Sequence, residues 1–419
     1  MPIKPYQDWS AVRLSSFAER VTRRNSELDS NVLTISATRG LVSQGEYFGK
    51  RIASANLASY YRILRGEFAY NKSYSNGYPL GAIKRLDHYA SGVVSPLYIC
   101  FSLTRSELVH SDYFVQYIEA GYLEEGLHGI AAEGARNHGL LNVKPSEFLN
   151  LCVTLPPLPE QKKIAAVLSS VDAAIEKTEA VIAQLQVVKK AMMEQLLTKG
   201  LPGRHTRFKQ TDLGEIPEDW EVLPLESIAS VERGKFSHRP RNDPAMFNGQ
   251  YPFIQTGDVA ACDGQITRYS QTLNERGLQV SRLFPAGTIV ITIAANIGDT
   301  GITPVDVAFP DSLVGIIANP GINNQYLELV LRSRKKVLEA QAPQNAQKNI
   351  NLQVLRPLLI PVPTFSEQQE ISSCLHAIAV SQHKEIAGLA ALRTLKSSLS
   401  SSLLSGELRV PTDSVPCPV

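Results

Sequence analysis

The chain contains one short pattern twice: LPPLPEQKKIAAVL at 155–168 and IPVPTFSEQQEISSCL at 360–375. In both stretches a proline-spaced apolar lead-in precedes a Glu-Gln pair, and apolar residues follow the glutamine at three and seven positions. The two Glu-Gln pairs stand 207 residues apart. This period is too long for a solenoid repeat. It therefore indicates the duplication of a whole globular unit together with the element that follows it.

Apolar residues continue after each Glu-Gln pair at alternating spacings of four and three. Such a heptad seam is typical of a long helix that packs against a partner helix. The two seams agree in register, and even their polar interruptions, Lys189 and Lys396, correspond. We therefore expect the two helices to pair with each other in an antiparallel arrangement. The seam residues are Ile164, Leu168, Val171, Ile175, Ile182, Leu185 and Leu196, and Ile371, Leu375, Ile378, Leu389, Leu392, Leu399 and Leu403.

Signals at both ends bound these helices. Pro159 stands where a first-turn proline is favoured, and Ser366 with Gln369 three residues later has the pattern of a capping box. Gly200 and Gly406 follow the seams and are typical helix stops. Each helix would run for about 40 residues, or roughly 60 Å.

The segments that precede the two helices share a few anchors and otherwise diverge. WSAVRL (9–14) matches WEVLPL (220–225), each with Trp and Leu five residues apart. Short apolar runs broken by Gly, Pro, Asn and Asp predict mixed α/β domains with short strands. One helix is expected in each domain, within 111–127 and within 323–340.

The predicted fold class is α+β, with two mixed α/β domains joined by two long antiparallel coiled-coil helices. The repeat predicts a pseudo-two-fold internal duplication. The expected parts are domain 1 at 1–158, the first helix at 159–200, a linker at 201–211, domain 2 at 212–365, the second helix at 366–407 and a tail at 408–419.

The composition is ordinary for a soluble globular protein, with 43% hydrophobic and 20% charged residues and a net charge of +2. No apolar run reaches the roughly 18 residues of a membrane span, and the N-terminus has no secretory signal, so we expect a cytoplasmic protein. The five cysteines lack zinc or redox spacing, and no phosphate loop, methyl-transfer tetrad or metal motif occurs. The sequence predicts neither a catalytic role nor a metal site for this chain.

Taken together, these features resemble the DNA-specificity (S) subunit of type I restriction–modification systems. The Pro-x-x-Glu-Gln entry, its repetition and the Trp-x4-Leu start of each divergent domain carry the resemblance, and PTFSEQ in the second half departs slightly from PLPEQ in the first. The resemblance implies a non-catalytic subunit in which each globular part is a target-recognition domain for one half of a bipartite DNA sequence. It also implies that the paired helices set the spacer between the two halves.

The resemblance implies partners as well. Double-stranded DNA is the expected ligand, and two methylation subunits would carry S-adenosylmethionine and methylate adenine. A restriction subunit that uses ATP and Mg²⁺ is a further partner that the resemblance allows, whereas no cofactor is expected in this chain. The alternatives are a coiled-coil interaction scaffold without DNA binding and a stand-alone nuclease or methyltransferase, which the missing motifs disfavour.

Base readout requires polar side chains on exposed loops. Four segments fit this requirement: 70–78 and 135–139 in domain 1, and 233–241 and 344–349 in domain 2. The alternative for each segment is an ordinary surface loop. The candidate DNA-binding residues are Lys72, Tyr74, Asn76, Arg136, Asn137 and His138, and Lys235, His238, Arg239, Arg241, Gln344, Asn345, Lys348 and Asn349.

Overall fold

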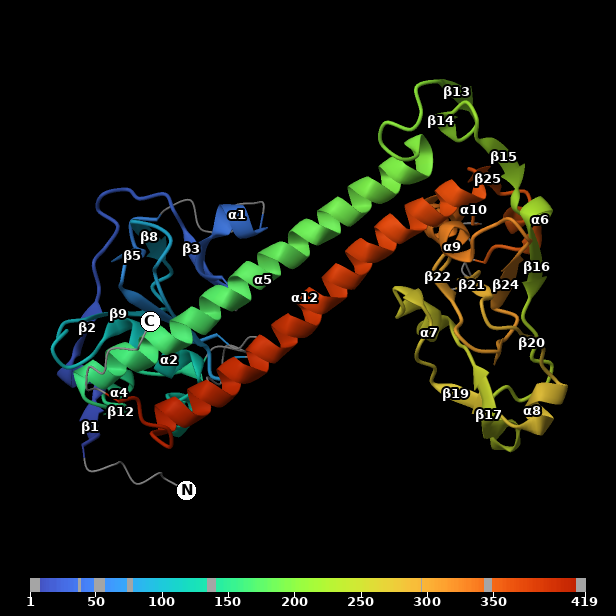
Figure 1. Ribbon diagram of the computed structural model, residues 1–419. Helices are drawn as coiled ribbons and strands as arrows, with labels where there is room; N and C mark the ends of the chain where they lie inside the picture. The colour runs from blue at the N-terminus through green and yellow to red at the C-terminus, as the bar shows by residue number, and fades with distance from the viewer. Residues whose placement is uncertain are drawn as a thin grey trace. The chain divides into compact units, whose positions relative to one another are not determined.

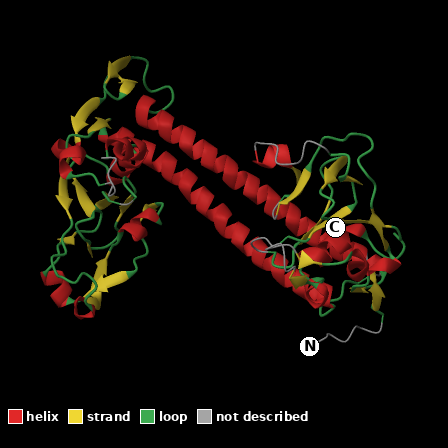
Figure 2. Ribbon diagram, turned by 180° about the vertical axis from the view of Figure 1, so that it is seen from behind, coloured by secondary structure: helices red, strands yellow, loops and turns green. Residues whose placement is uncertain are grey.

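A computed structural model shows a chain that forms two compact units (Figures 1 and 2). Unit 1 comprises Met1–Glu179 and Ala387–Val419, and unit 2 comprises Ala180–Ile386. Each long helix begins in one unit and ends in the other. The structure describes residues 8–36, 39–48, 57–73, 78–133, 141–294, 296–342 and 349–411.

The two long helices are α5 (Leu158–Lys199) and α12 (Phe365–Ser405), of 42 and 41 residues. Pro159 lies in the first turn of α5, as predicted. Gly200 follows α5 with φ +74°, and Gly406 follows α12 with φ +83°. A glycine in the left-handed conformation is the usual helix stop because it has no Cβ to clash. The predicted helix ends at the two glycines are confirmed.

The start of α12 differs from the predicted capping box. The helix begins at Phe365, and the Thr364 hydroxyl accepts a hydrogen bond from the Glu367 N–H at 3.4 Å. Ser366 lies inside the first turn, where its hydroxyl donates to Glu370 at 3.2 Å. The prediction was wrong by two residues because threonine caps helices nearly as well as serine, and the sequence offers both.

Within unit 1, the first half of α5 and the last half of α12 lie side by side (Figures 1 and 2). Asp172 binds Lys396 at 2.5 Å and Glu179 binds Arg393 at 2.7 Å. Residue numbers thus rise along one helix as they fall along the other. The predicted antiparallel pairing is confirmed in this unit.

Within unit 2, the end of α5 pairs with the start of α12. Leu196 and Leu197 of α5 share one buried core with Ile371 and Leu375 of α12. This core continues into the globular domain of the unit, so the helices and the domain are one packed body. Every predicted seam residue, in both helices, is buried or half-buried.

In both domains the strand that follows the tryptophan of the repeat, Trp9 or Trp220, pairs with the last strand of the domain. Strand β1 (Ser10–Arg13) runs antiparallel to β12 (Cys152–Leu155), and β15 (Glu221–Pro224) runs antiparallel to β25 (Leu359–Val362). The strand that follows each tryptophan therefore lies beside the strand that leads into a long helix. This shared frame places the beginning and the end of each domain together.

The domain in unit 1 contains a four-stranded antiparallel sheet in the order β2-β9-β6-β7. The rings of Phe68 and Phe101 from this sheet are stacked, with 5.1 Å between their centroids, and Phe114 of α2 packs against both. The remaining strands pair as β3–β4, β5–β8 and β10–β11. The elements are β2 (Ala18–Val21), β3 (Leu33–Ser36), β4 (Gly40–Ser43), α1 (Gln44–Phe48), β5 (Tyr61–Leu64), β6 (Phe68–Asn71), β7 (Ala82–Arg85), β8 (Ser91–Val94), β9 (Ile99–Leu103), α2 (Ser111–Glu119), α3 (Glu124–Ile130), β10 (Ala132–Glu133), β11 (Leu141–Asn142) and α4 (Pro145–Leu149).

The domain in unit 2 is built differently inside its frame. It has a five-stranded sheet in the order β16-β24-β21-β22-β18, a four-stranded sheet in the order β19-β17-β23-β20, and the hairpin β13–β14. The elements are β13 (Phe208–Thr211), β14 (Gly214–Pro217), α6 (Leu225–Ile228), β16 (Ala229–Arg233), β17 (Phe247–Phe253), α7 (Thr256–Ala260), β18 (Gly264–Gln265), β19 (Gln271–Leu273), α8 (Glu275–Gln279), β20 (Leu283–Phe284), β21 (Ile289–Thr292), β22 (Thr300–Ile302), β23 (Val307–Ala308), β24 (Leu313–Ala318), α9 (Asn324–Ser333), α10 (Lys335–Gln341) and α11 (Leu352–Leu355).

The single helix expected within 111–127 and within 323–340 is two helices in each case, so that prediction was wrong. Gly121, with φ +82°, separates α2 from α3. Arg334 separates α9 from α10, and its N–H is shared between the carbonyls of Val330 and Leu331. Such a shared bond tightens the turn and ends the regular helix.

Candidate nucleic-acid interface and its helix anchors

The glutamate of the first Glu-Gln pair fastens α5 to the beginning of domain 1. Glu160 is buried, and its carboxylate accepts hydrogen bonds from the Trp9 indole Nε1 at 3.3 Å and from the Arg409 guanidinium at 2.7 and 2.9 Å. Arg409 also binds Asp8 at 2.5 Å, and this bond holds the pKa of Asp8 below its usual range. A buried carboxylate is stable only with such partners. We call Asp8, Trp9, Glu160 and Arg409 the first anchor.

Glu367 makes the equivalent set of contacts in unit 2. It is buried and accepts a hydrogen bond from the Trp220 indole Nε1 at 3.2 Å. His205 lies between two carboxylates, with Nε2 at 2.7 Å from Glu367 Oε1 and Nδ1 at 3.0 Å from Asp219 Oδ1. The second anchor therefore consists of Asp219, Trp220, Glu367 and His205. Both anchors combine an Asp-Trp pair, the helix glutamate and a basic residue from the segment that follows the other long helix.

The glutamine of each pair holds the loop in front of a domain helix. The Gln161 Oε1 accepts a hydrogen bond from the His110 N–H at 2.8 Å, and its Nε2 donates to the carbonyls of Leu108 and Pro156, both at 2.9 Å. A side chain thus satisfies backbone groups that would otherwise be buried without partners. The partners of Gln368 are the Asn323 N–H at 2.8 Å and the carbonyls of Pro363 at 2.9 Å and Gly321 at 3.5 Å.

The basic stretch 233–241 of domain 2 forms a loop with a fixed backbone. Phe236 is buried and packs against Phe247 and Phe253. The N–H groups of Gly234, Lys235 and Ser237 all donate to backbone carbonyls of neighbouring segments. The polar side chains of the loop therefore project from a fixed base, as base readout requires.

Three of the four candidate side chains in this loop are engaged with their surroundings. His238 lies 2.8 Å from Asp243, Arg239 donates to backbone carbonyls, and Arg241 binds Asp311 at 2.9 Å. In the described part of the chain the Lys235 ammonium group has no hydrogen-bond or ion-pair partner, and this side chain is exposed. Lys235 is accordingly the side chain of this loop that is most available to a phosphate or a base.

Of the other candidate DNA-binding residues, the structure describes only Lys72 and Asn349. Lys72 is half-buried, and its Nζ donates to the Val143 carbonyl at 3.3 Å. Burial, and to a smaller extent the charge of Arg20, lowers the pKa of Lys72. Asn349 is exposed and forms an isolated bridge with Ala294. The candidates Tyr74, Asn76, Arg136, Asn137, His138, Gln344, Asn345 and Lys348 lie outside the described residues.

The structure adds two exposed residues that the sequence reasoning did not select. Arg268 and Tyr269 stand on the short loop between β18 and β19, and Tyr269 is 45% exposed. Neither side chain has a hydrogen-bond partner within the described ranges. Arginine and an aromatic ring are suited to phosphate binding and base stacking. The available signal was the Arg-Tyr pair itself, in a polar stretch between two short strands.

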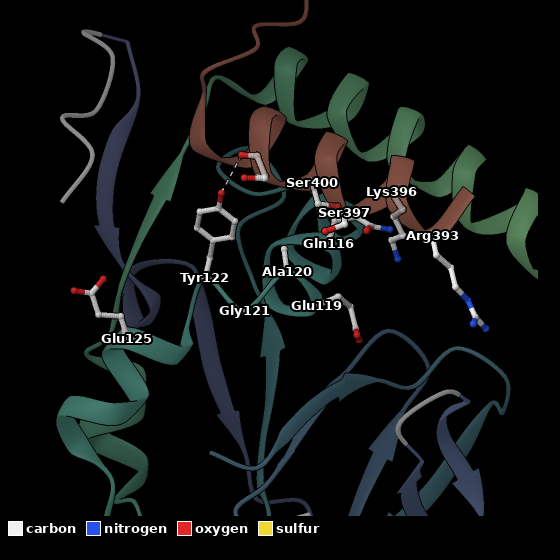
Figure 3. Close-up of a pocket in the computed structure, with 11 residues that line it drawn as sticks. Gln116, Glu119, Ala120, Gly121, Tyr122, Glu125, Arg393, Lys396, Ser397 and Ser400 are labelled. Atoms are coloured by element: carbon white, nitrogen blue, oxygen red, sulfur yellow. Dashed lines mark hydrogen bonds between the residues drawn. The ribbon is translucent and has the colours of Figure 1, made fainter. Parts of the chain in front are cut away.

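A groove of about 650 Å³ lies beside α12 in unit 1 (Figure 3). The Tyr122 hydroxyl donates to the Ser401 carbonyl at 3.2 Å at one end of it. Arg393 and Lys396 line the α12 side, but both are paired with carboxylates of α5. Glu119, on the opposite side, is paired with Lys84 at 2.6 Å. Arg393, Lys396 and Glu119 are thus already paired within the unit.

Two further observations concern the described part of the chain alone. No three His, Cys, Asp or Glu side chains there come close enough together to hold a metal ion. No helix there is both long enough and apolar enough to cross a membrane.

The sequence matches the family model of the type I restriction modification DNA specificity domain over residues 132–187 and 217–387. It is 30% identical over 286 residues to the type I restriction enzyme MjaVIII specificity subunit of Methanocaldococcus jannaschii, a match that covers 65% of each chain. It is 27% identical over 274 residues to the EcoBI specificity subunit of Escherichia coli, covering 61% of this chain and 58% of that relative.

The fold has a known counterpart too. The crystal structure of the type I restriction–modification S subunit from M. genitalium shares 13% identity with a TM-score of 0.57, covering 96% of this chain and 98% of that one. The α+β fold with two domains joined by long helices is thereby confirmed. Because the family model matches more than half of the sequence, the chain belongs to the type I restriction–modification DNA specificity family. Specificity subunits are the non-catalytic components of these systems.

Proposed function

We propose that this protein is the sequence-specific DNA-binding subunit of a type I restriction–modification complex and that each domain reads one half of a bipartite target. The observation that carries the proposal is a shared frame with different contents. The anchors and the closing strand pairs are equivalent in the two domains. The sheets inside them differ, with one four-stranded sheet in the first domain and a five-stranded and a four-stranded sheet in the second. A protein that reads two different half-sites needs two domains that are attached in the same way but differ in the structure that contacts the bases.

We propose that the long helices act as the spacer element and as the docking site of two methylation subunits. The two-fold relation of the repeat matches the two-fold relation of the DNA backbones, as operator symmetry mirrors dimer symmetry. Two domains in successive major-groove stretches would contact half-sites about 34 Å apart. In unit 2, Val187 of α5 and Val380 and Ile386 of α12 are exposed apolar side chains, a feature that supports docking of a partner.

The small net charge of the chain also supports DNA binding that is shared with partner subunits. A net charge of +2 is small for a protein that neutralises many phosphates by itself. Partner subunits would supply the remaining phosphate contacts. We propose that methylation subunits carry S-adenosylmethionine, and that a restriction subunit, where present, carries ATP and Mg²⁺. Because DNA is the ligand, we place the complex in the cytoplasm. The comparisons give no support to an interaction scaffold without DNA binding.

The test is to express the chain with the methylation subunit of its own system and to map modified adenines by long-read sequencing. We expect one bipartite motif. Replacing residues 8–157 by the equivalent segment of a relative should change one half of that motif, and replacing 220–363 should change the other half. Absence of any bipartite motif, or a change of both halves in one exchange, would contradict the proposal.

A further inference from the structure

Both long helices carry a lysine at the same position of their apolar seams, 207 residues apart: Lys189 and Lys396. A lysine in a seam reduces apolar packing and is retained where it fixes geometry. The two side chains are only 16% and 28% exposed. Each ammonium group binds a carboxylate, Lys189 with Asp263 at 2.7 Å and Lys396 with Asp172 at 2.5 Å. The packing of the seam alone does not explain these bonds.

In unit 2, Asp263 of the recognition domain binds Lys189 of α5. Asp263 follows α7 and also accepts a hydrogen bond from Arg332 of α9 at 2.5 Å, and His383 of α12 lies 3.8 Å away. Burial opposes the ionisation of Asp263, but Lys189 and Arg332 outweigh it and hold its pKa below the usual range. The guanidinium of Arg332 is held in turn by Glu328 at 2.7 Å. We call Lys189, Asp263 and Arg332 the second clasp.

In unit 1, Asp172 of α5 has the corresponding role. It binds Lys396 of α12 and also accepts a hydrogen bond from the Gln116 Nε2 of α2 at 2.8 Å. Gln116 is buried. Asp172, Lys396 and Gln116 are the first clasp. In unit 1 the carboxylate of Asp172 therefore ties together α5, α12 and α2, and in unit 2 the carboxylate of Asp263 ties α5 to α9.

Each clasp lies well away from the anchor of its unit. Along α5, Asp172 stands about 18 Å from Glu160 at 1.5 Å per residue. Lys189 stands about 16 Å from Gly200, the residue that borders the second anchor. A domain attached at one end of a helix can pivot about that end, whereas a second attachment at this distance fixes its angle.

We propose that the two clasps are positioning contacts that fix the angle of each recognition domain on the helix pair and thereby the spacer length that the protein accepts. The inference rests on the proposed function. One base pair of spacer shifts the second half-site by about 3.4 Å and rotates it by roughly 35°. To distinguish spacers that differ by one base pair, the position and the angle of each domain must vary by less than this shift and rotation.

The test measures adenine methylation at targets with unchanged half-sequences and a spacer that is native, one base pair longer or one base pair shorter. We expect Lys189→Gln and Lys396→Gln to raise the ratio of off-spacer to native-spacer methylation at least tenfold. The half-sequences should stay unchanged, and Lys189→Arg should retain the native ratio. The matched controls are Lys190→Gln, which removes an exposed neighbouring lysine, and Arg393→Gln, which removes an ion pair between α5 and α12 that involves no recognition domain.

An unchanged spacer ratio in folded Lys189→Gln and Lys396→Gln proteins would overturn the inference and leave the proposed function intact. Failure of the proposed function is distinguishable, because the wild-type chain would then produce no bipartite motif at all. Should Lys189→Gln fold poorly, Lys189→Met is used in its place, because methionine keeps an apolar side chain in the seam without the ammonium group. If both variants fail to fold, the contact is required for the fold itself and the positioning role is refuted.

Discussion

Glu160 and Glu367 are carboxylates with almost no solvent contact, 1% and 2% exposed, at the first turns of two long helices. An indole N–H and a basic side chain face each of them. The N-terminal end of a helix also favours a negative charge. At the scale of single residues, these two side chains explain why the Glu-Gln pair is repeated: the glutamate and the glutamine connect a helix to a domain through different bonds.

We expect Glu367→Ala to lower the free energy of unfolding of unit 2 by about 3 kcal/mol, because it leaves the Trp220 indole N–H and the His205 ring without their buried partner. Glu370→Ala is the control, since Glu370 pairs with Arg204 on the exposed face of the same helix and should cost less than about 1 kcal/mol. Denaturant unfolding followed by Trp220 fluorescence in a Trp9→Phe background reports unit 2. Equal losses in the two variants would show that Glu367 is not an anchor.

Cys100 lies in the buried core of domain 1, and burial raises the pKa of its thiol to about 12 from an ordinary value of 9.0. The folded state keeps this proton above pH 9, whereas the unfolded chain releases it. Stability is therefore unaffected below pH 9 and falls as pH rises from 9 towards 12, by up to about 1.4 kcal/mol per pH unit. Cys100→Ala should lose less stability than the wild type over this range. The measurement is urea unfolding at pH 8, 9 and 10, and a constant difference between the two proteins would contradict the prediction.

At the scale of elements, the helix stop after α5 also shapes the second anchor. Gly200 has φ +74°, and a Cβ there would lie 2.6 Å from His205 and 2.8 Å from Glu367. Gly203 has φ +78° and nothing within 4 Å of the same position. Both glycines adopt a left-handed conformation, but only Gly200 is pressed against neighbouring side chains. The close contact explains why this stop tolerates no side chain.

We expect Gly203→Ala to destabilise unit 2 by about 1 kcal/mol, which is the cost of the left-handed conformation alone. Gly200→Ala should cost about 3 kcal/mol, because overpacking against the anchor adds to that cost. Thermal and denaturant unfolding of the two variants measure the difference. Similar values for both would mean that the anchor adjusts freely to the added methyl group.

The long helices were the most predictable elements, because a seam of nearly five heptads and two glycine stops leave little choice of position. The breaks at Gly121 and Arg334 were missed because a helical pattern continues across them and only the backbone geometry interrupts it. The anchors join residues 151 and 147 positions apart, and a one-dimensional pattern does not contain such contacts. The matched Trp and Glu residues were visible, but their bond was not.

The candidate DNA-contact residues were less predictable for a related reason. A base-reading loop is recognised by its exposure and by side chains without internal partners, and both depend on the folded neighbourhood. His238 and Arg241 looked free in the sequence but pair with Asp243 and Asp311. Arg268 and Tyr269 were not selected from the sequence, because an Arg-Tyr pair alone does not indicate exposure, but both are exposed in the structure. The choice among these residues stays a prediction.

At the scale of the whole molecule, each domain depends on both long helices. The first anchor takes its glutamate from the start of α5 and its arginine from the segment after α12. The second takes its glutamate from the start of α12 and its histidine from the segment after α5. The arrangement is cyclic, so neither half of the chain contains a complete anchor. Duplication alone therefore did not produce two independent modules.

This cyclic construction leads to a prediction about helix length. Four residues inserted into α5 after Glu179, and four into α12 before Arg393, lengthen the helix pair by about 6 Å and turn it by roughly 40°. One base pair advances DNA by about 3.4 Å and rotates it by roughly 35°, so the added turn matches about one base pair in rotation and about two in length. We expect the accepted spacer to grow by one to two base pairs while both half-sequences stay the same. A four-residue insertion underwinds a paired seam without breaking it.

Mapping of methylated adenines in cells that express the lengthened chain measures both quantities at once. The matched control inserts the same four residues after Asp212, in the turn between β13 and β14, where no residue of an anchor or a clasp lies. That control should leave the spacer unchanged. A longer spacer in the control would mean that the spacer depends on the length of the chain outside the helices. Altered half-sequences in the protein with lengthened helices would mean that the insertion changes the domains themselves. Either result would contradict the role of the helices in setting the distance between the half-sites.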